Sequence, residues 1–206
     1  IGNRRLMRQS RIYTPQRLAS DETVQLEKSA GHYLSRVLRL AEGDQVTLFN
    51  GDGWNYRAKI CGIRRDAVKV RIDDARVAGI ESPLKITLVQ AISRGERMDY
   101  AIQKATDLGV STIQPLTSHR VEVRLDEKRL AKRMTHWQGV ATSACEQSGR
   151  ATIPEIRTPV SLTQWISDRS DSRRLVLSPL AETGLSSLPI SGDTVSVLIG
   201  PEGGFS

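Results

Sequence analysis

The stretch TVSVLIGPEGGFS, residues 194–206, contains the feature that decides the fold. The apolar run 194–199 is typical of a buried parallel strand, and it leads directly into a loop containing Gly200, Gly203 and Gly204. Ligands of open α/β sheets bind beyond the carboxyl ends of strands, and glycine lets the backbone come close to a ligand. These residues therefore predict a binding loop, although taken alone they also fit an ordinary β-turn.

Upstream of this loop, strands and helices alternate. KITLVQA (85–91) is a compact strand-forming run, and residues 112–115 and 175–177 are two further short strands. Between them we predict a helix that ends at Gly109, with apolar residues on one face. A second, longer helix covers residues 126–148, and its apolar stripe is Leu130, Met134, Trp137, Val140 and Ala144. This rhythm predicts a parallel α/β sheet. Because a parallel strand is normally covered on both faces, we expect a further C-terminal segment to follow residue 206.

The first part of the chain has a different pattern. Residues 45–49, 54–63 and 67–72 are short strands, and Asn50–Gly53 is a hairpin signal between the first two. One short helix is expected at 32–40. Short strands with glycine turns indicate a small β-barrel at 7–75, and 76–83 is a linker or boundary strand. The α/β domain then occupies 84–206.

The composition limits the possible partners. The net charge of +7 favours a polyanion, because phosphates release counterions when cations bind them. No apolar run is long enough to span a bilayer, and residues 1–10 do not resemble a secretory signal. Cys61 and Cys145 lie far apart, which suits a reducing cytoplasm, and the three histidines are too scattered to predict a metal site. A P-loop and a GxGxxG motif are both absent from the sequence.

Four segments in order carry a family resemblance: HYLSRVLR (32–39), QKATDLGV (103–110), ACEQSGR (144–150) followed by Pro154, and IGPEGG (199–204). Together they resemble the ribosomal RNA small subunit methyltransferase E family, which belongs to the SPOUT superfamily and methylates N3 of a uridine in 16S ribosomal RNA. The resemblance extends from about Met7 to Ser206. The family's C-terminal LGxRxLRxETA element, which completes the knot and one wall of the cofactor pocket, is not found in residues 1–206.

This resemblance implies a trefoil-knotted α/β domain after a PUA-like barrel, in a homodimer without a metal. It also implies S-adenosylmethionine as cofactor, held by backbone groups of two loops present here. The predicted cofactor-binding residues are Leu177, Ser178, Pro179, Ile199, Gly200, Pro201, Glu202, Gly203 and Gly204. The implied partner is small-subunit ribosomal RNA, either naked or in the assembled subunit.

The reaction suggests which side chains catalyse it. Methyl transfer from a sulfonium is an in-line displacement, so positioning supplies much of the rate. Uridine N3 becomes nucleophilic as its proton leaves and charge develops on the neighbouring carbonyls. Glu202 is the candidate base, and Arg150 and Arg120 are candidates to stabilise that charge. Glu202 fits equally well as the cap of a following helix.

Several cations and one amide are candidates for RNA binding. Arg36 and Arg39, three residues apart, are expected on one helix face, and Arg8 and Arg11 extend this basic surface. The remaining candidates are Lys104, which could face a phosphate, and Gln147, which could contact the edge of the uracil. The cations between Lys128 and Arg133 fit a solvated helix face better.

Two other functions remain open from the sequence. One is a non-catalytic RNA-binding or ribosome-assembly protein, which would have no use for the glycine loop. The other is a transfer-RNA methyltransferase of the same superfamily, because the Gly-Pro-Glu-Gly motif is shared more widely than the substrate. The HYLSRVLR and ACEQSGR segments favour the ribosomal substrate.

Overall fold

The computed structural model describes residues 10–65, 67–79, 81–93, 95–117, 127–168, 173–178, 180–188 and 192–200. Contacts divide the chain into two compact units. The first unit is Ile1–Glu81 together with Cys145–Thr152, and the second is Ser82–Ala144 together with Ile153–Ser206. The division after Glu81 falls inside the predicted linker. That residues 145–152 belong to the first unit was not predicted, because this depends on contacts between residues far apart in the sequence.

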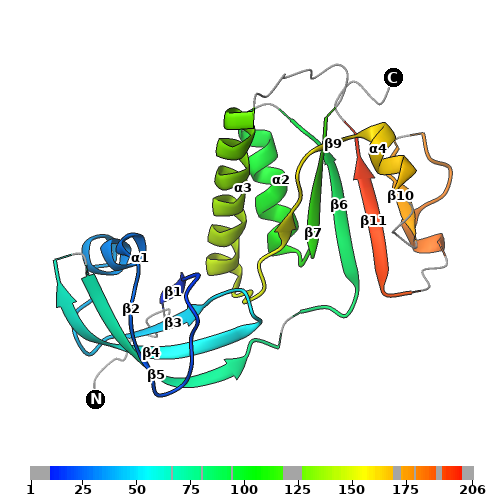
Figure 1. The fold of residues 1–206 in the computed structure, drawn as a ribbon. Coiled ribbons are helices and arrows are strands. Elements are labelled where there is room, and N and C mark those ends of the chain that lie inside the picture. Colours follow the sequence, from blue (N-terminus) through cyan, green and yellow to red (C-terminus); the bar gives the residue numbers. More distant parts are fainter. Residues whose placement is uncertain are drawn as a thin grey trace, which may run out of the picture. The chain divides into compact units, whose positions relative to one another are not determined.

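The first unit consists of short strands with one helical segment. Its elements are β1 (Ser10–Tyr13), β2 (Thr23–Gln25), α1 (Lys28–His32), the π-helical turn η1 (Tyr33–Val37), β3 (Gln45–Phe49), β4 (Trp54–Arg64) and β5 (Ala67–Val77) (Figure 1). The strands form one sheet in the order β1-β3-β4-β5-β2. Strand β5 continues five residues beyond the predicted end at Ile72, so the predicted linker begins inside a strand.

The core of this unit follows from the period of the strands. Alternate side chains of a strand point to opposite faces, and in β4 and β5 the buried residues are every second one over most of each strand. The buried core residues are Ile12, Leu18, Leu26, Leu34, Val46, Leu48, Tyr56, Ala58, Ile60, Val68, Val70 and Ile72. Leu34 comes from the helical segment, so this segment covers the core-facing side of the sheet.

The predicted helix at 32–40 is wrong in its bounds and in its geometry. It begins at Lys28, widens into a π-helical turn, and ends at Val37. Arg39 follows in the left-handed conformation, with φ of 53°, which turns the chain away from the helix axis. Arg36 and Arg39 therefore do not share a helix face, because only Arg36 lies within the helical segment.

The second unit is the predicted parallel α/β domain. Its elements are β6 (Lys85–Ala91), α2 (Glu96–Asp107), β7 (Thr112–Thr117), α3 (Glu127–Ser148, whose last four residues belong to the first unit), β8 (Glu155–Ile156), β9 (Val160–Ser161), α4 (Leu162–Ser167), β10 (Arg174–Val176), the 3-10 helix η3 (Leu185–Ser187) and β11 (Thr194–Ile199). The sheet order is β10-β11-β6-β7-β8, with β9 also pairing with β7. Every pairing in this sheet is parallel.

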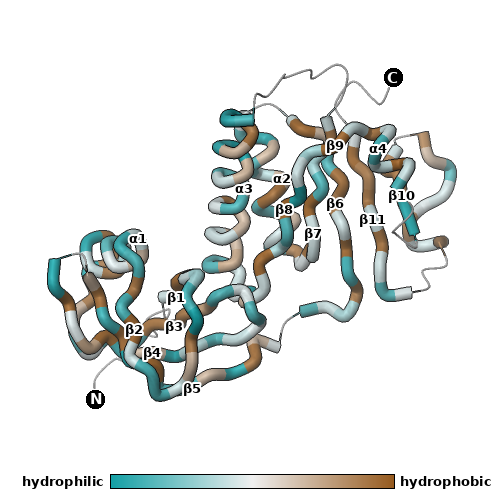
Figure 2. The backbone as a smooth tube through the Cα atoms, in the orientation of Figure 1, coloured by the Kyte–Doolittle hydropathy of each residue, from teal (hydrophilic) through white to brown (hydrophobic). Residues whose placement is uncertain are grey.

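Helices cover both faces of the parallel sheet (Figure 1). On one face, residues of α2 and α3 such as Met98, Ile102 and Trp137 pack against Ile113 of β7. On the other, Trp165 of α4 packs with Val89 and Leu198. The brown stretches of β6, β7 and β11 in Figure 2 reflect this burial. Strands buried on both faces explain why these segments are nearly continuous apolar runs. The knot remains a prediction.

Candidate cofactor site and RNA-binding residues

The ends of β10 and β11 bring the two predicted cofactor segments together. Residues Arg174–Val176 pair in parallel with Ser196–Leu198, and the Leu177 amide donates to the Leu198 carbonyl at 3.1 Å. Gly200 follows β11 directly. Both segments therefore follow the carboxyl ends of two adjacent strands. Parallel α/β sheets bind their ligands at this end of the strands.

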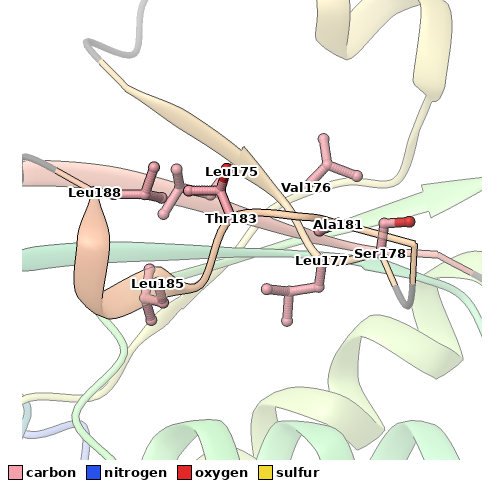
Figure 3. A pocket seen from close by; sticks show the side chains of 8 residues that line it. All are labelled: Leu175, Val176, Leu177, Ser178, Ala181, Thr183, Leu185 and Leu188. Atoms are coloured by element: carbon pink, nitrogen blue, oxygen red, sulfur yellow. The ribbon is translucent and has the colours of Figure 1, made fainter.

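A hollow of about 510 Å³ lies beside β10 and the segment after it (Figure 3). It is lined by Leu175, Val176, Leu177, Ser178, Ala181, Thr183, Leu185 and Leu188. The lining is mostly apolar, yet Leu177 and Leu185 remain 53% and 57% exposed. Concave surfaces that expose apolar side chains beside a few polar groups are typical of small-molecule sites.

Ser178 shapes the loop at this hollow. Its hydroxyl accepts a hydrogen bond from the Leu180 amide at 3.2 Å, and its carbonyl accepts one from the Ala181 amide at 3.1 Å. The predicted residue thus stabilises a tight turn directly after β10. Such a turn keeps main-chain groups of the loop at the edge of the sheet.

Sequence reasoning missed two buried glutamines at the same end of the sheet. Gln90 of β6, 7% exposed, pairs with Ile199 in the strand register, and its side-chain amide donates to the Ala91 carbonyl at 3.0 Å. Gln114 of β7 donates to the carbonyls of Pro115 and Thr158, both at 3.0 Å. Buried amide groups need hydrogen-bond partners, and the two glutamine side chains find them in main-chain carbonyls near the ends of the strands. A polar residue near the end of a buried strand could have indicated them.

Part of the predicted site lies outside the described residues. This holds for the cofactor-loop residues Pro179, Pro201, Glu202, Gly203 and Gly204, and also for Arg8 and Arg120.

Arg150, a candidate for stabilising charge on the substrate, is enclosed by the first unit. Its side chain is 5% exposed, and its guanidinium contacts the Glu81 carboxylate through two hydrogen bonds of 3.0 and 2.8 Å. Paired donors of this kind form a strong, planar contact. Because two of its guanidinium nitrogens already donate to the Glu81 carboxylate, the arrangement favours a structural role for Arg150 over contact with a substrate.

Arg11, a candidate for RNA contact, is also held internally. Its guanidinium donates to the Asn55 side chain at 2.6 Å and to the Arg150 carbonyl at 3.0 Å, and it lies over the Phe49 ring. Burial lowers the pKa of Arg11, partly offset by nearby Cys145 and Glu146. These contacts join β1 to β4 and to residues 145–152, so they favour a structural role for Arg11, and its contact with RNA stays a prediction.

Glu146 makes the second link between this segment and β1. Its carboxylate accepts a hydrogen bond from the Tyr13 amide at 3.0 Å. Burial raises the pKa of Glu146, while the Tyr13 hydrogen bond and the charge of Arg11 act in the opposite direction. Within the first unit, Glu146 and Arg150 of the ACEQSGR segment thus join residues 145–152 to β1 and to Glu81.

The raised pKa of Glu146 predicts a pH-dependent stability. Its folded-state pKa exceeds its ordinary value of 4.5, so the folded protein binds more protons between the two values. This contribution to stability is fully present below pH 4.5 and is lost as the pH rises through the raised pKa. Glu146→Gln keeps an acceptor for Tyr13 and should remove this component. Urea unfolding at several pH values measures it, with the exposed Glu155→Gln as control. A wild-type-minus-variant difference that stays constant with pH would contradict it.

The remaining RNA candidates are exposed, but in different surroundings. Arg36 and Arg39 lie on the helical segment of the first unit and just after it. Lys104 forms an ion pair with Asp107 at 2.9 Å, which raises the pKa of Lys104. Gln147 lies in the last turn of α3. Lys128, Arg129 and Lys132 are exposed, in line with the predicted solvated helix face.

The described residues include no group of three or more histidine, cysteine, aspartate or glutamate side chains placed to hold a metal ion. No helix among them combines the length and the apolar character required to cross a membrane.

Comparison with protein families gives two matches in the order of the two units. Residues 26–73 match the RNA methyltransferase PUA domain, and residues 80–206 match the RNA methyltransferase domain. Among curated relatives, the ribosomal RNA small subunit methyltransferase E of Buchnera aphidicola (subsp. Schizaphis graminum) is 35% identical over 95% of this chain and 80% of its own length. The enzyme of that name from Bacillus subtilis is 27% identical over 94% of this chain and 79% of its own length.

Solved structures share the fold over almost the whole chain. A methyltransferase of Legionella pneumophila, solved with SAM bound, has a TM-score of 0.92 and 41% identity, covering 97% of this chain and 83% of that one. The ribosomal RNA small subunit methyltransferase E of Neisseria gonorrhoeae, solved bound to S-adenosyl methionine, has a TM-score of 0.90 and 35% identity, covering 96% and 82%.

The parallel sheet with its edge hollow, preceded by a PUA domain, defines an RNA methyltransferase of the SPOUT type. More narrowly, the chain belongs to the ribosomal RNA small subunit methyltransferase E family.

Proposed function

We propose that this protein transfers a methyl group from S-adenosylmethionine to N3 of a uridine in 16S ribosomal RNA. The observation that carries the proposal is the hollow beside β10 and the segment after it, in a domain that matches the RNA methyltransferase domain. Two structural relatives are solved with that cofactor. The proposed place of action is the cytoplasm, where ribosomal RNA is found.

The residues that line the hollow fit such a cofactor. S-adenosylmethionine has an apolar adenine ring, and Leu177 and Leu185 expose apolar surface that a ring would cover. The turn at Ser178 and the start of the glycine loop at Gly200 offer main-chain donors and acceptors for its polar edge. We infer that the segments 177–179 and 199–204 hold the cofactor.

The bound cofactor supplies an electrophilic methyl group on a positively charged sulfur, so the proposal assigns no metal. The chain must then make N3 nucleophilic. Glu202 would accept the N3 proton, and Arg120 would donate to a uracil carbonyl oxygen on which negative charge develops. Arg150, paired with Glu81, would act indirectly, by holding residues 145–152 in place within the first unit.

RNA binding is assigned to exposed groups in both units. Arg8, Arg36 and Arg39 would contact phosphates from the first unit, while Lys104 and Gln147 would contact the RNA near the target base. A base in folded RNA must be displaced before its N3 is accessible, and loops or bulges permit this at low cost. We propose that the active form is a homodimer.

Leu185→Asp should weaken cofactor binding about tenfold or more, because a charge in an apolar hollow must lose hydration when a ring covers it. Leu108→Asp is the matched control, since Leu108 at the end of α2 is 85% exposed and lies outside the hollow. Isothermal titration with S-adenosylmethionine measures both variants. Equal affinities for the two would show that the hollow is not the cofactor site.

The activity itself is tested with tritium-labelled S-adenosylmethionine. Label should pass to isolated small subunits or to naked 16S ribosomal RNA, and mass spectrometry of the digested RNA should identify 3-methyluridine. Transfer to transfer RNA instead would show a different substrate. Tight RNA binding without any transfer would favour a ribosome-assembly protein and exclude the proposed reaction.

A further inference from the structure

The outer face of β4 and β5 carries cations at positions that point away from the core. In β4, Ala58 and Ile60 are buried and Lys59 between them is exposed. In β5, Val70 and Ile72 are buried, and Lys69 and Arg71 are exposed. The three cations therefore project on the side of the sheet opposite the core. The helical segment with Arg36 inserts Leu34 into that core, so it covers the other side.

The strand register brings two of these cations directly opposite each other. Lys59 pairs with Arg71, and the row continues to Gln45 on β3 and Thr23 on β2. The next row contains Lys69, with Gln25 of β2 beside it. The first row combines two cations with two neutral side chains that can donate hydrogen bonds, the second combines one of each, and neither row contains a carboxylate.

Among the described residues these cations form no ion pair, unlike Arg57 and Arg76, which both contact Asp74. The nearest carboxylates in the sequence lie just outside the rows. Asp73 follows Arg71 by two residues, Glu22 precedes Thr23, and Asp44 precedes Gln45, where its side chain accepts a hydrogen bond from the Ala41 amide. Like charges directly opposite each other in a sheet destabilise it. The free protein thus bears a repulsion that a bound anion would relieve.

We propose that this face, defined by Lys59, Lys69 and Arg71, is a second RNA-contacting surface that binds the phosphate backbone, separate from Arg36 and Arg39. The inference rests on the proposed function, since it assumes an RNA substrate. Phosphates suit it because two adjacent cations on β4 and β5 are flanked by neutral donors on β3 and β2. The exposed large apolar residues of the first unit, Tyr33, Val37, Trp54 and Val77, lie outside these rows, so an apolar protein interface is less suited to this face.

The test compares two variants of the full chain with the same change of charge. Lys59→Gln/Arg71→Gln removes the opposed pair, and Lys128→Gln/Lys132→Gln removes two exposed lysines of α3. Fluorescence anisotropy with a short fluorescein-labelled single-stranded RNA gives the affinity at several salt concentrations. The first variant should bind about tenfold more weakly, and its slope of log affinity against log salt should be smaller by about 1.4, at about 0.7 per lost phosphate contact. The second should bind as the wild type does.

Thermal unfolding adds a readout that a merely structural role would not give. Lys59→Glu replaces a repulsive cross-strand pair by an attractive one, so it should raise the melting temperature while weakening RNA binding. Weaker binding with unchanged or higher stability supports the surface. Unchanged affinity and salt slope in both Lys59 variants would overturn it. Cofactor affinity and methyl transfer by the wild type are measured in parallel, so loss of this surface is distinguished from failure of the proposed function.

Discussion

Replacing Glu202 by Gln should lower the rate of methyl transfer at saturating cofactor and RNA by about 10²- to 10⁴-fold, the usual contribution of a general base. The amide cannot accept the N3 proton, yet it keeps the size and hydrogen-bonding capacity of the side chain. Affinity for S-adenosylmethionine should change little. Single-turnover kinetics with tritium-labelled cofactor, together with a separate binding titration, measure the two quantities.

The control is Glu182→Gln, which makes the same chemical change at an exposed carboxylate in the segment after β10. Its rate should equal that of the wild type. If Glu202 merely caps a helix, Glu202→Gln will lower the melting temperature by a small amount and leave turnover intact. Unchanged turnover would therefore remove Glu202 as the base, without affecting the assignment of the cofactor site.

Glu81→Ala should destabilise the protein by about 3 kcal/mol, because it leaves the guanidinium of Arg150 buried without its carboxylate. The value lies at the lower end for a broken buried pair, since the Glu81 side chain is itself 28% exposed. The double variant Glu81→Leu/Arg150→Met should recover most of this loss, because it removes both charges and fills similar volumes. Urea unfolding followed by circular dichroism measures the free energy of unfolding.

Glu155→Ala is the matched control, because it removes a carboxylate from an exposed pair with Arg157, whose side chains are 63% and 43% exposed. This substitution should lower the free energy of unfolding by about 0–1 kcal/mol. Equal costs for Glu81→Ala and Glu155→Ala would show that the Arg150 contact contributes no more than a surface pair. If methyl transfer by Glu81→Ala stayed normal under conditions where the variant is folded, the positioning role of Arg150 would also fail.

Local sequence patterns predicted most of the secondary structure. The strands 45–49, 85–91 and 194–199 have the predicted bounds, and Gly109 and Gly149 follow α2 and α3 with positive φ. The patterns are reliable there because burial on one or both sides of a strand leaves a direct trace in the residue types. They failed at residues 32–40, where the π-helical turn and the left-handed Arg39 have no signal of their own.

The candidate site could be predicted only where it is encoded locally. The segments 177–178 and 199–200 were predicted from the family resemblance, the second also from its glycines, and the parallel register places both at the same end of adjacent strands. The internal contacts of Arg11 and Arg150 were not predicted, because charge alone does not reveal partners 139 and 69 residues away. Gln114 was missed for a similar reason, since one of its acceptors, the Thr158 carbonyl, lies 44 residues away.

By itself, the sequence determined the type of each domain, the last strand and the family, because periodicity and short motifs are properties of neighbouring residues. Only the tertiary structure decided which cations are available to RNA. Arg11 and Arg150 are enclosed by contacts between distant segments, whereas Lys59 and Arg71 meet on an open face because the β4–β5 register aligns them. The physical reason is that the availability of a charge depends on its partners and its burial, and both are set by long-range packing.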